Sequence, residues 1–202
     1  MLKTKWWLLP IIYIAVIWLM FGVQKFFKIQ ETLALYPKDT NHLLGVFTTV
    51  FLHSDLLHLV SNTLPLLGCM LALFYFYKDI SLRVLFISHI VTGLLIWIIA
   101  RPAFHIGASG LVYALVLFLL VSGFIRKNKQ LSFLALAVLS IQSGLIWGVL
   151  PQQNGISWES HLIGGIVGAT LAFIYKHKGP QADKPYHWNE DENKSDEYKH
   201  FE

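Results

Sequence analysis

The chain has 202 residues, of which 55% are hydrophobic and only 14% are charged. A soluble domain of this size carries about 25% charged residues, so the composition excludes an ordinary soluble fold and indicates a protein surrounded largely by lipid. The formal net charge is +4. The lysines and arginines stand between apolar runs rather than in basic–aromatic patches, so we expect no nucleic-acid partner.

Six apolar stretches are long enough to cross a bilayer. A helical span needs roughly 20 mostly apolar residues, and backbone groups in lipid require the internal hydrogen bonds of a helix. The sequence therefore predicts an all-α polytopic membrane protein with six transmembrane helices. The expected ranges are about 6–23, 56–77, 82–100, 106–125, 131–150 and 158–175.

The basic residues that flank these stretches predict an orientation. Nine of them fall on one side of the six helices and four on the other. Because basic residues are enriched on the cytoplasmic side, we expect both termini in the cytoplasm, and a bacterial inner membrane as the location. The nine are Lys3, Lys5, Lys78, Arg83, Arg126, Lys127, Lys129, Lys176 and Lys178, and the four are Lys25, Lys28, Lys38 and Arg101.

The chain divides into one membrane domain, residues 1–178, and a polar cytoplasmic tail, residues 179–202, which we expect to be disordered. The run 6–23 is longer than a signal-peptide core, so we expect a retained first helix. The long loop 24–53 mixes apolar and polar residues, and we expect it to lie partly in the membrane interface.

A first polar motif, Gly107-Ala108-Ser109-Gly110, opens the fourth predicted helix. Glycines beside a serine allow close approach of a substrate backbone. A serine at a helix start also lies beside free N–H groups, which suits a nucleophile whose intermediate is an oxyanion. A helix N-cap or a small-residue helix contact would explain the motif equally well.

A second motif runs from His161 through Gly164 to Gly168 at the start of the sixth predicted helix. The two glycines form a small-residue face, and His161 shares that face. If the neighbouring helix is the fourth, Ser109 and His161 can form a nucleophile–base pair. The alternative is a histidine that merely bonds a neighbouring carbonyl.

A third motif places His58 and Asn62 one turn apart in the second predicted helix. Both side chains can donate hydrogen bonds, so they could stabilise an oxyanion, or they could be polar contacts between helices. All three motifs lie near the start of even-numbered helices. With an inside N-terminus they share the outer half of the membrane, as one water-filled catalytic cavity would require.

Together these segments resemble the rhomboid intramembrane serine proteases. The match includes Phe51 to Asn62 at the second helix, the Gly107–Gly110 motif with Tyr113, and Ser157 to Gly164 with Gly168, and it covers about residues 6–176. The resemblance implies a six-helix rhomboid-like bundle. The long first loop lacks the Trp-Arg pair of many relatives.

The resemblance also implies roles for individual residues. Ser109 would be the nucleophile and His161 its base, and His58, Asn62 and the Ser109 N–H would hold the oxyanion. Tyr113 would pack against the His161 ring, Glu159 would be a loop residue outside the dyad, and His53 would be structural. The supporting glycines would be Gly107, Gly110, Gly164 and Gly168.

The expected activity is endoproteolysis of transmembrane or juxtamembrane segments, without metal or cofactor. The expected partners are transmembrane protein substrates and membrane lipid. Three alternatives stay open: a non-proteolytic membrane-protein binder of the same fold, a small transporter, and a metalloprotease using His58, His105 and His161. Largely apolar inner halves of the even-numbered helices argue against the transporter.

Overall fold

The computed structural model describes residues 6–141, 150 and 157–182, and within these ranges every regular element is a helix. The end of the fifth predicted span and residues 183–202 of the predicted tail lie outside the described residues. The prediction of an all-helical membrane protein is confirmed. In the part of the chain that the structure describes, four helices are long and apolar enough to cross a membrane: α1 (Leu8–Phe26), α4 (Leu56–Phe76), α5 (Ser81–Ile99) and α6 (Ser109–Arg126).

Two further helices are apolar but shorter. Helix α9 (Trp158–Ile174) has 17 residues, at the short end of the lengths that span a bilayer. Helix α7 (Lys129–Ile141) is described over 13 residues of the fifth predicted span. The described helices thus occupy all six predicted positions.

Two helices begin later than the approximate starts predicted for them. The first helix begins at Leu8 rather than Trp6 and continues to Phe26, with Pro10 in its first turn, where a missing N–H costs nothing. The fourth begins at Ser109 rather than Ile106, because Gly107 has a φ of 109°, a left-handed conformation that ends regular helix. Ser109 is therefore the first residue of α6.

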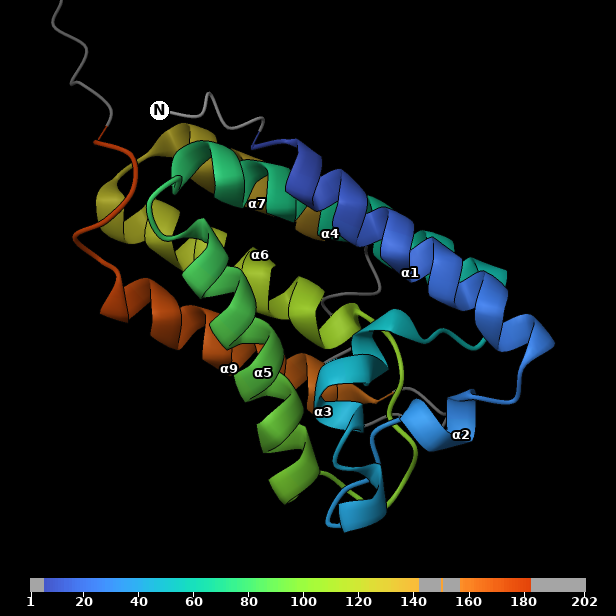
Figure 1. Ribbon diagram of the computed structural model, residues 1–202. Coiled ribbons are helices and arrows are strands. Elements are labelled where there is room, and N and C mark those ends of the chain that lie inside the picture. The colour runs from blue at the N-terminus through green and yellow to red at the C-terminus, as the bar shows by residue number, and fades with distance from the viewer. Residues whose placement is uncertain (1–5, 142–149, 151–156, 183–202) are drawn as a thin grey trace, which may run out of the picture.

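The long first loop folds into short helical turns. These are α2 (Gln30–Leu33), η1 (Thr40–His42), α3 (Gly45–Thr48) and η2 (Thr49–Phe51). Helix α3 packs closely on α5, where a Cβ at Gly93 would lie 2.5 Å from the carbonyl oxygen of Val46. Figure 1 shows α2 and α3 gathered beside the start of α6.

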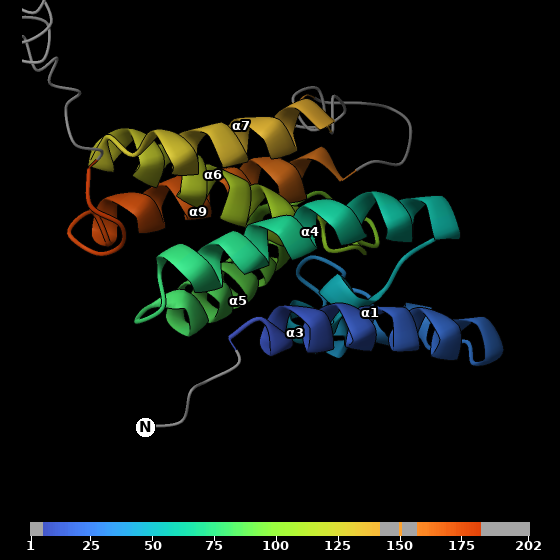
Figure 2. The same ribbon diagram turned by 90° about the horizontal axis from the view of Figure 1, so that it is seen from above.

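Helix α6 forms the centre of the bundle. Its side chains Leu115, Phe118 and Leu119 are fully buried, and α4, α5, α7 and α9 surround it in both views (Figures 1 and 2). Helix α1 lies at the edge against α4, and only Pro10 and Ile17 of its residues are buried. The core thus sits around α6, and α1 presents most of its surface to lipid.

Candidate active site

Ser109 and His161 lie at the starts of two packed helices. Ser109 is the first residue of α6, and His161 is in the first turn of α9. The distance between Ser109 Oγ and His161 Nε2 is 2.8 Å. At this distance the hydroxyl can donate its proton to the ring nitrogen, which is the geometry of a nucleophile and its general base.

Close packing of α6 against α9 sets this distance. A Cβ at Gly164 would overlap the carbonyl oxygen of Gly110, and a Cβ at Gly168 would overlap that of Ala114. Only glycine at these two positions allows the two backbones to touch. The predicted glycine face therefore points at α6, and His161 is carried on it.

Tyr113 fixes the plane of the His161 ring. It lies one turn after Ser109 in α6, and the two rings are stacked with centroids 4.3 Å apart and an interplanar angle of 14°. Aromatic stacking favours such parallel geometry. Helix α6 therefore carries both the serine hydroxyl and the platform for the histidine ring.

His58 and Asn62 occupy successive turns of α4 and face the backbone just before Ser109. A Cβ at Gly107 would lie 2.8 Å from His58 Nε2 and 4.0 Å from Asn62 Nδ2. The amide of Asn62 donates to the carbonyl of His58 at 3.0 Å, and His58 Nδ1 lies 3.1 Å from Ser54 Oγ. The structure thus brings all four predicted polar residues to one end of the bundle.

A cavity of ≈ 570 Å³ lies over this cluster. Ser109, His161 and His58 line it, together with Asp55, which caps α4 by accepting from the His58 N–H. That hydrogen bond and one from Ser54 hold the pKa of Asp55 below its usual value. The cavity is large enough for an extended stretch of polypeptide backbone.

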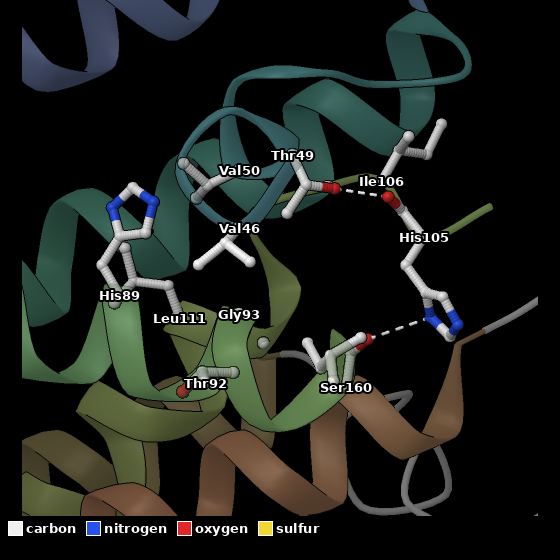
Figure 3. Close-up of a pocket in the computed structure, with 13 residues that line it drawn as sticks. Val46, Thr49, Val50, His89, Thr92, Gly93, His105, Ile106, Leu111 and Ser160 are labelled. Atoms are coloured by element: carbon white, nitrogen blue, oxygen red, sulfur yellow. Dashed lines mark hydrogen bonds between the residues drawn. The ribbon is translucent and has the colours of Figure 1, made fainter. Parts of the chain in front are cut away.

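The first loop holds the segment that leads into Ser109. Leu35 and His105 form an antiparallel bridge, and the Gly107 N–H donates to the carbonyl of Thr49 at 3.0 Å. The Thr49 hydroxyl donates to the carbonyl of His105 (Figure 3). The loop is therefore anchored to this segment mainly through backbone groups.

The His105 side chain connects this segment to the start of α9. Its Nδ1 lies 3.4 Å from Ser160 Oγ (Figure 3). The same nitrogen lies 2.5 Å from Ser157 Oγ, and Nε2 lies 3.2 Å from the carbonyl of Arg101. Burial lowers the pKa of His105. Among the described residues, no three His, Cys, Asp or Glu side chains are grouped so that they could hold a metal ion.

A smaller cavity of ≈ 30 Å³ lies behind Gly107 and Gly110, between α3, α5 and α6 (Figure 3). Thr92 is one of its lining residues, and the buried Thr92 hydroxyl has no hydrogen-bond partner among the described residues. A volume of this size has room for about one water molecule.

Glu159 differs from its predicted place. It is in the first turn of α9 rather than in a loop, its side chain is 10% exposed, and its Oε1 lies 3.1 Å from Arg101 Nε. The pair joins the end of α5 to the helix that carries His161. The sequence signal for this contact was the carboxylate of Glu159, two residues before the candidate base His161. The partner of Glu159, Arg101, lies 58 residues away in the chain.

His53 lies fully buried beside the site. Its ring meets the edge of His58 with centroids 5.0 Å apart, and neither ring nitrogen has a hydrogen-bond partner among the described residues. Burial lowers the pKa of His53 to about 3. Gln24 of α1 holds the backbone of His53, a contact that sequence reasoning missed.

The Rhomboid domain matches residues 40–178. The chain belongs to the rhomboid family. The matched range begins in the first loop of this rhomboid protein and contains α4 to α9, so it includes Ser109, His161, His58 and Asn62.

Individual relatives agree with this assignment. The chain is 35% identical over 150 residues to an uncharacterized protein of Mycobacterium tuberculosis, covering 68% of this chain and 61% of the relative. An uncharacterized protein of Mycobacterium leprae is 34% identical over 147 residues, covering 67% and 57%. A protein of Acanthamoeba polyphaga mimivirus with a provisional rhomboid name is 26% identical over 156 residues, covering 68% and 78%. This rhomboid chain thus spans less than two thirds of the length of its mycobacterial relatives.

Proposed function

We propose that this rhomboid protein is an intramembrane serine endopeptidase that cleaves transmembrane or juxtamembrane segments of other membrane proteins. The observation that carries the proposal is the 2.8 Å approach of His161 Nε2 to Ser109 Oγ under an open cavity. Buried polar pairs are costly in a membrane protein and are retained mainly for function.

In the proposed reaction, Ser109 Oγ attacks the scissile carbonyl carbon as its proton passes to His161 Nε2. The tetrahedral intermediate collapses when His161 returns that proton to the leaving amine, which leaves an ester on Ser109. Water then attacks the ester as His161 takes its proton. The bond between the acyl carbon and Ser109 Oγ breaks, His161 returns the proton to Ser109 Oγ, and the new carboxyl terminus leaves. The stacking of Tyr113 on His161 supports this cycle, because the ring stays oriented through both proton transfers.

The proposed oxyanion donors are the Ser109 N–H, His58 and Asn62. The N–H of a first helical residue has no partner within its helix. The nearness of His58 Nε2 and Asn62 Nδ2 to Gly107 supports a donor role. For Asn62 to take it, the amide would exchange its hydrogen bond with the His58 carbonyl for one with the oxyanion.

Substrate selection follows from the same geometry. A peptide bond within a helix is shielded by its own turn, so a transmembrane substrate must unwind before Ser109 can reach it. We therefore expect substrates with helix-breaking residues near the cleaved bond. A reporter with a continuous poly-leucine helix should be cleaved slowly, and equally fast cleavage would contradict this expectation.

We further propose that the protein resides in a bacterial inner membrane with both termini in the cytoplasm. The excess of basic residues around the ends of α4, α6 and α9 supports this orientation. The cavity over Ser109 would then open toward the outer face.

The decisive test compares purified wild-type protein with Ser109→Ala in detergent, using a labelled transmembrane reporter and a gel shift. We expect cleavage by the wild type, no cleavage by Ser109→Ala, and no effect of a metal chelator. Ser140→Ala, an exposed serine in α7, is the matched control and should cleave normally.

The other outcomes separate the alternatives. Cleavage that persists in Ser109→Ala and stops with the chelator would replace the proposal with a metalloprotease. Tight binding of the reporter by wild type and Ser109→Ala alike, without cleavage by either, would favour the non-proteolytic binder.

A further inference from the structure

A second groove lies at the opposite end of the bundle from the serine and histidine. It has a volume of ≈ 280 Å³ and is formed where the N-terminus of α1, the end of α4 and the start of α5 meet. Figure 2 shows these three helix ends side by side. Its lining residues are Trp6, Leu9, Phe74, Lys78, Ser81 and Leu82.

The groove exists because α1 is only partly packed on the bundle. Helix α1 packs mainly against α4 and η2, and it reaches α5 through a hydrogen bond between Tyr13 and His89. Beyond that bond, toward the start of α1, Leu9 and Leu82 remain 42% and 60% exposed. The walls between α1 and α5 are therefore apolar and open to the acyl-chain region of the bilayer.

The mouth of the groove is basic and aromatic. Lys78 lies over the ring of Tyr75 with its Nζ 5.9 Å from the centroid, and Tyr75 contacts Trp6 with ring centroids 5.7 Å apart. Tyrosine and tryptophan rings prefer the depth of lipid headgroups. An ammonium group at that depth can bind a phosphate, and the indole N–H of Trp6 is a second donor type.

The protein surface around the mouth of the groove is also basic. The helix ends on this side carry seven lysines and arginines, and Asp79 is the single carboxylate among them in the described residues. Arg126 ties the end of α6 to the carbonyl of Lys176, so these basic ends form one face. The seven are Lys78, Arg83, Arg126, Lys127, Lys129, Lys176 and Lys178.

We propose that this groove binds an anionic phospholipid of the surrounding bilayer. The phosphate lies at Lys78, with Trp6 at the headgroup level, and one acyl chain runs between Leu9 and Leu82. The apolar walls of the groove match the acyl chains of a phospholipid, and the cationic mouth matches its anionic headgroup. The bound lipid fills the space between α1 and α5 that the protein leaves unpacked. This inference does not depend on the protease activity.

Native mass spectrometry of the full-length protein in detergent tests the proposal. We would titrate phosphatidylglycerol and, separately, phosphatidylcholine with matched acyl chains. We expect tighter binding of phosphatidylglycerol by the wild type. Lys78→Gln should weaken phosphatidylglycerol binding about fivefold, the effect of one basic residue near an anionic headgroup, and should leave phosphatidylcholine binding nearly unchanged.

Two matched controls keep the test specific to the groove. Lys127→Gln removes a charge from the same basic face but outside the groove. It should leave the affinity for the first bound phosphatidylglycerol molecule unchanged. Leu82→Trp should obstruct the acyl-chain path and weaken both lipids, whereas Phe86→Trp, one turn further along α5 and 65% exposed, should weaken neither. Equal affinity for the two lipids, or equal weakening by Lys78→Gln and Lys127→Gln, would overturn the proposal.

Discussion

The contact between α6 and α9 and the contact between α1 and its neighbours represent two ways of packing helices in lipid. Helices α6 and α9 touch backbone to backbone through Gly164 and Gly168, and α6 is buried along most of its length. Helix α1 is apolar on all sides and buries only Pro10 and Ile17. Because lipid is as apolar as leucine, hydrophobicity alone does not bring membrane helices together. Small residues do so at the candidate active site, whereas a Cβ added at Gly22 of α1 would meet no atom within 4 Å, and α1 stays at the edge.

The glycine contacts should be the most sensitive part of the molecule. Gly164→Ala would force α9 away from the Gly110 carbonyl and separate His161 from Ser109. A displacement of about 1 Å in a catalytic pair can cost about 100-fold in rate, so we expect at least this loss in reporter cleavage.

Control substitutions of glycine by alanine are available on α9 and on α1. Gly165→Ala introduces only ordinary contact, with Leu117 Cγ at 3.6 Å, and Gly22→Ala in α1 meets nothing within 4 Å. Both should cleave the reporter at close to the wild-type rate. If Gly164→Ala is as active as Gly165→Ala, close packing of α6 and α9 does not set the catalytic distance.

The ion pair between Arg101 and Glu159 should show an asymmetric effect on stability. Arg101→Gln leaves the Glu159 carboxylate buried without its Arg101 partner, whereas Glu159→Gln affects a side chain, Arg101, that is 43% exposed and can be solvated. An unsatisfied buried polar group costs about 1–3 kcal/mol. We therefore expect Arg101→Gln to lower the melting temperature in detergent more than Glu159→Gln does.

The double variant Arg101→Gln/Glu159→Gln provides the control, because it removes both charges at once. It should melt above Arg101→Gln. A double variant that is less stable than either single variant would show that the two side chains stabilise the fold through separate contacts.

The stacking of Tyr113 on His161 should have a moderate effect on rate. Tyr113→Leu removes the ring, and the loss of a stacked aromatic pair is worth about 0.5–1.5 kcal/mol, so we expect about a 2- to 10-fold lower kcat with little change in KM. Tyr113→Phe keeps the stacked ring and should retain more activity than Tyr113→Leu. Equal rates for Phe and Leu at this position would mean that stacking does not orient His161.

The smallest expected effect is the contribution of His53 to the pH dependence of stability. In the folded state burial lowers the pKa of His53 to about 3, while an unfolded histidine titrates near 6.5. Between these values the unfolded state binds a proton that the folded state does not, so the free energy of unfolding falls as pH falls below 6.5. Melting temperatures at pH 7.5 and pH 5 should therefore differ less for His53→Asn than for the wild type. An unchanged difference would remove His53 from the pH response.

The sequence was sufficient for the helices and for the choice of polar residues. Length and hydropathy located the spans because a lipid-exposed backbone must be helical, and errors arose only at ends such as Ser109, where the conformation of Gly107 decided the start of the helix. The cost of polar side chains in lipid singled out Ser109, His161, His58 and Asn62 from the sequence. Their common location followed from helix direction alone.

Tertiary structure decided the distances and the long-range partners. Spacing along one helix could place His161 on the glycine face, but only the packing of α9 on α6 could bring it to 2.8 Å from Ser109. The pairing of Arg101 with Glu159 and the bridge between Leu35 and His105 join segments far apart in the chain, so no local pattern predicts them. The groove beside Lys78 likewise exists only because three helix ends meet. The local sequence determines the secondary structure of each segment, and the packing of helices against one another determines which chemical groups meet.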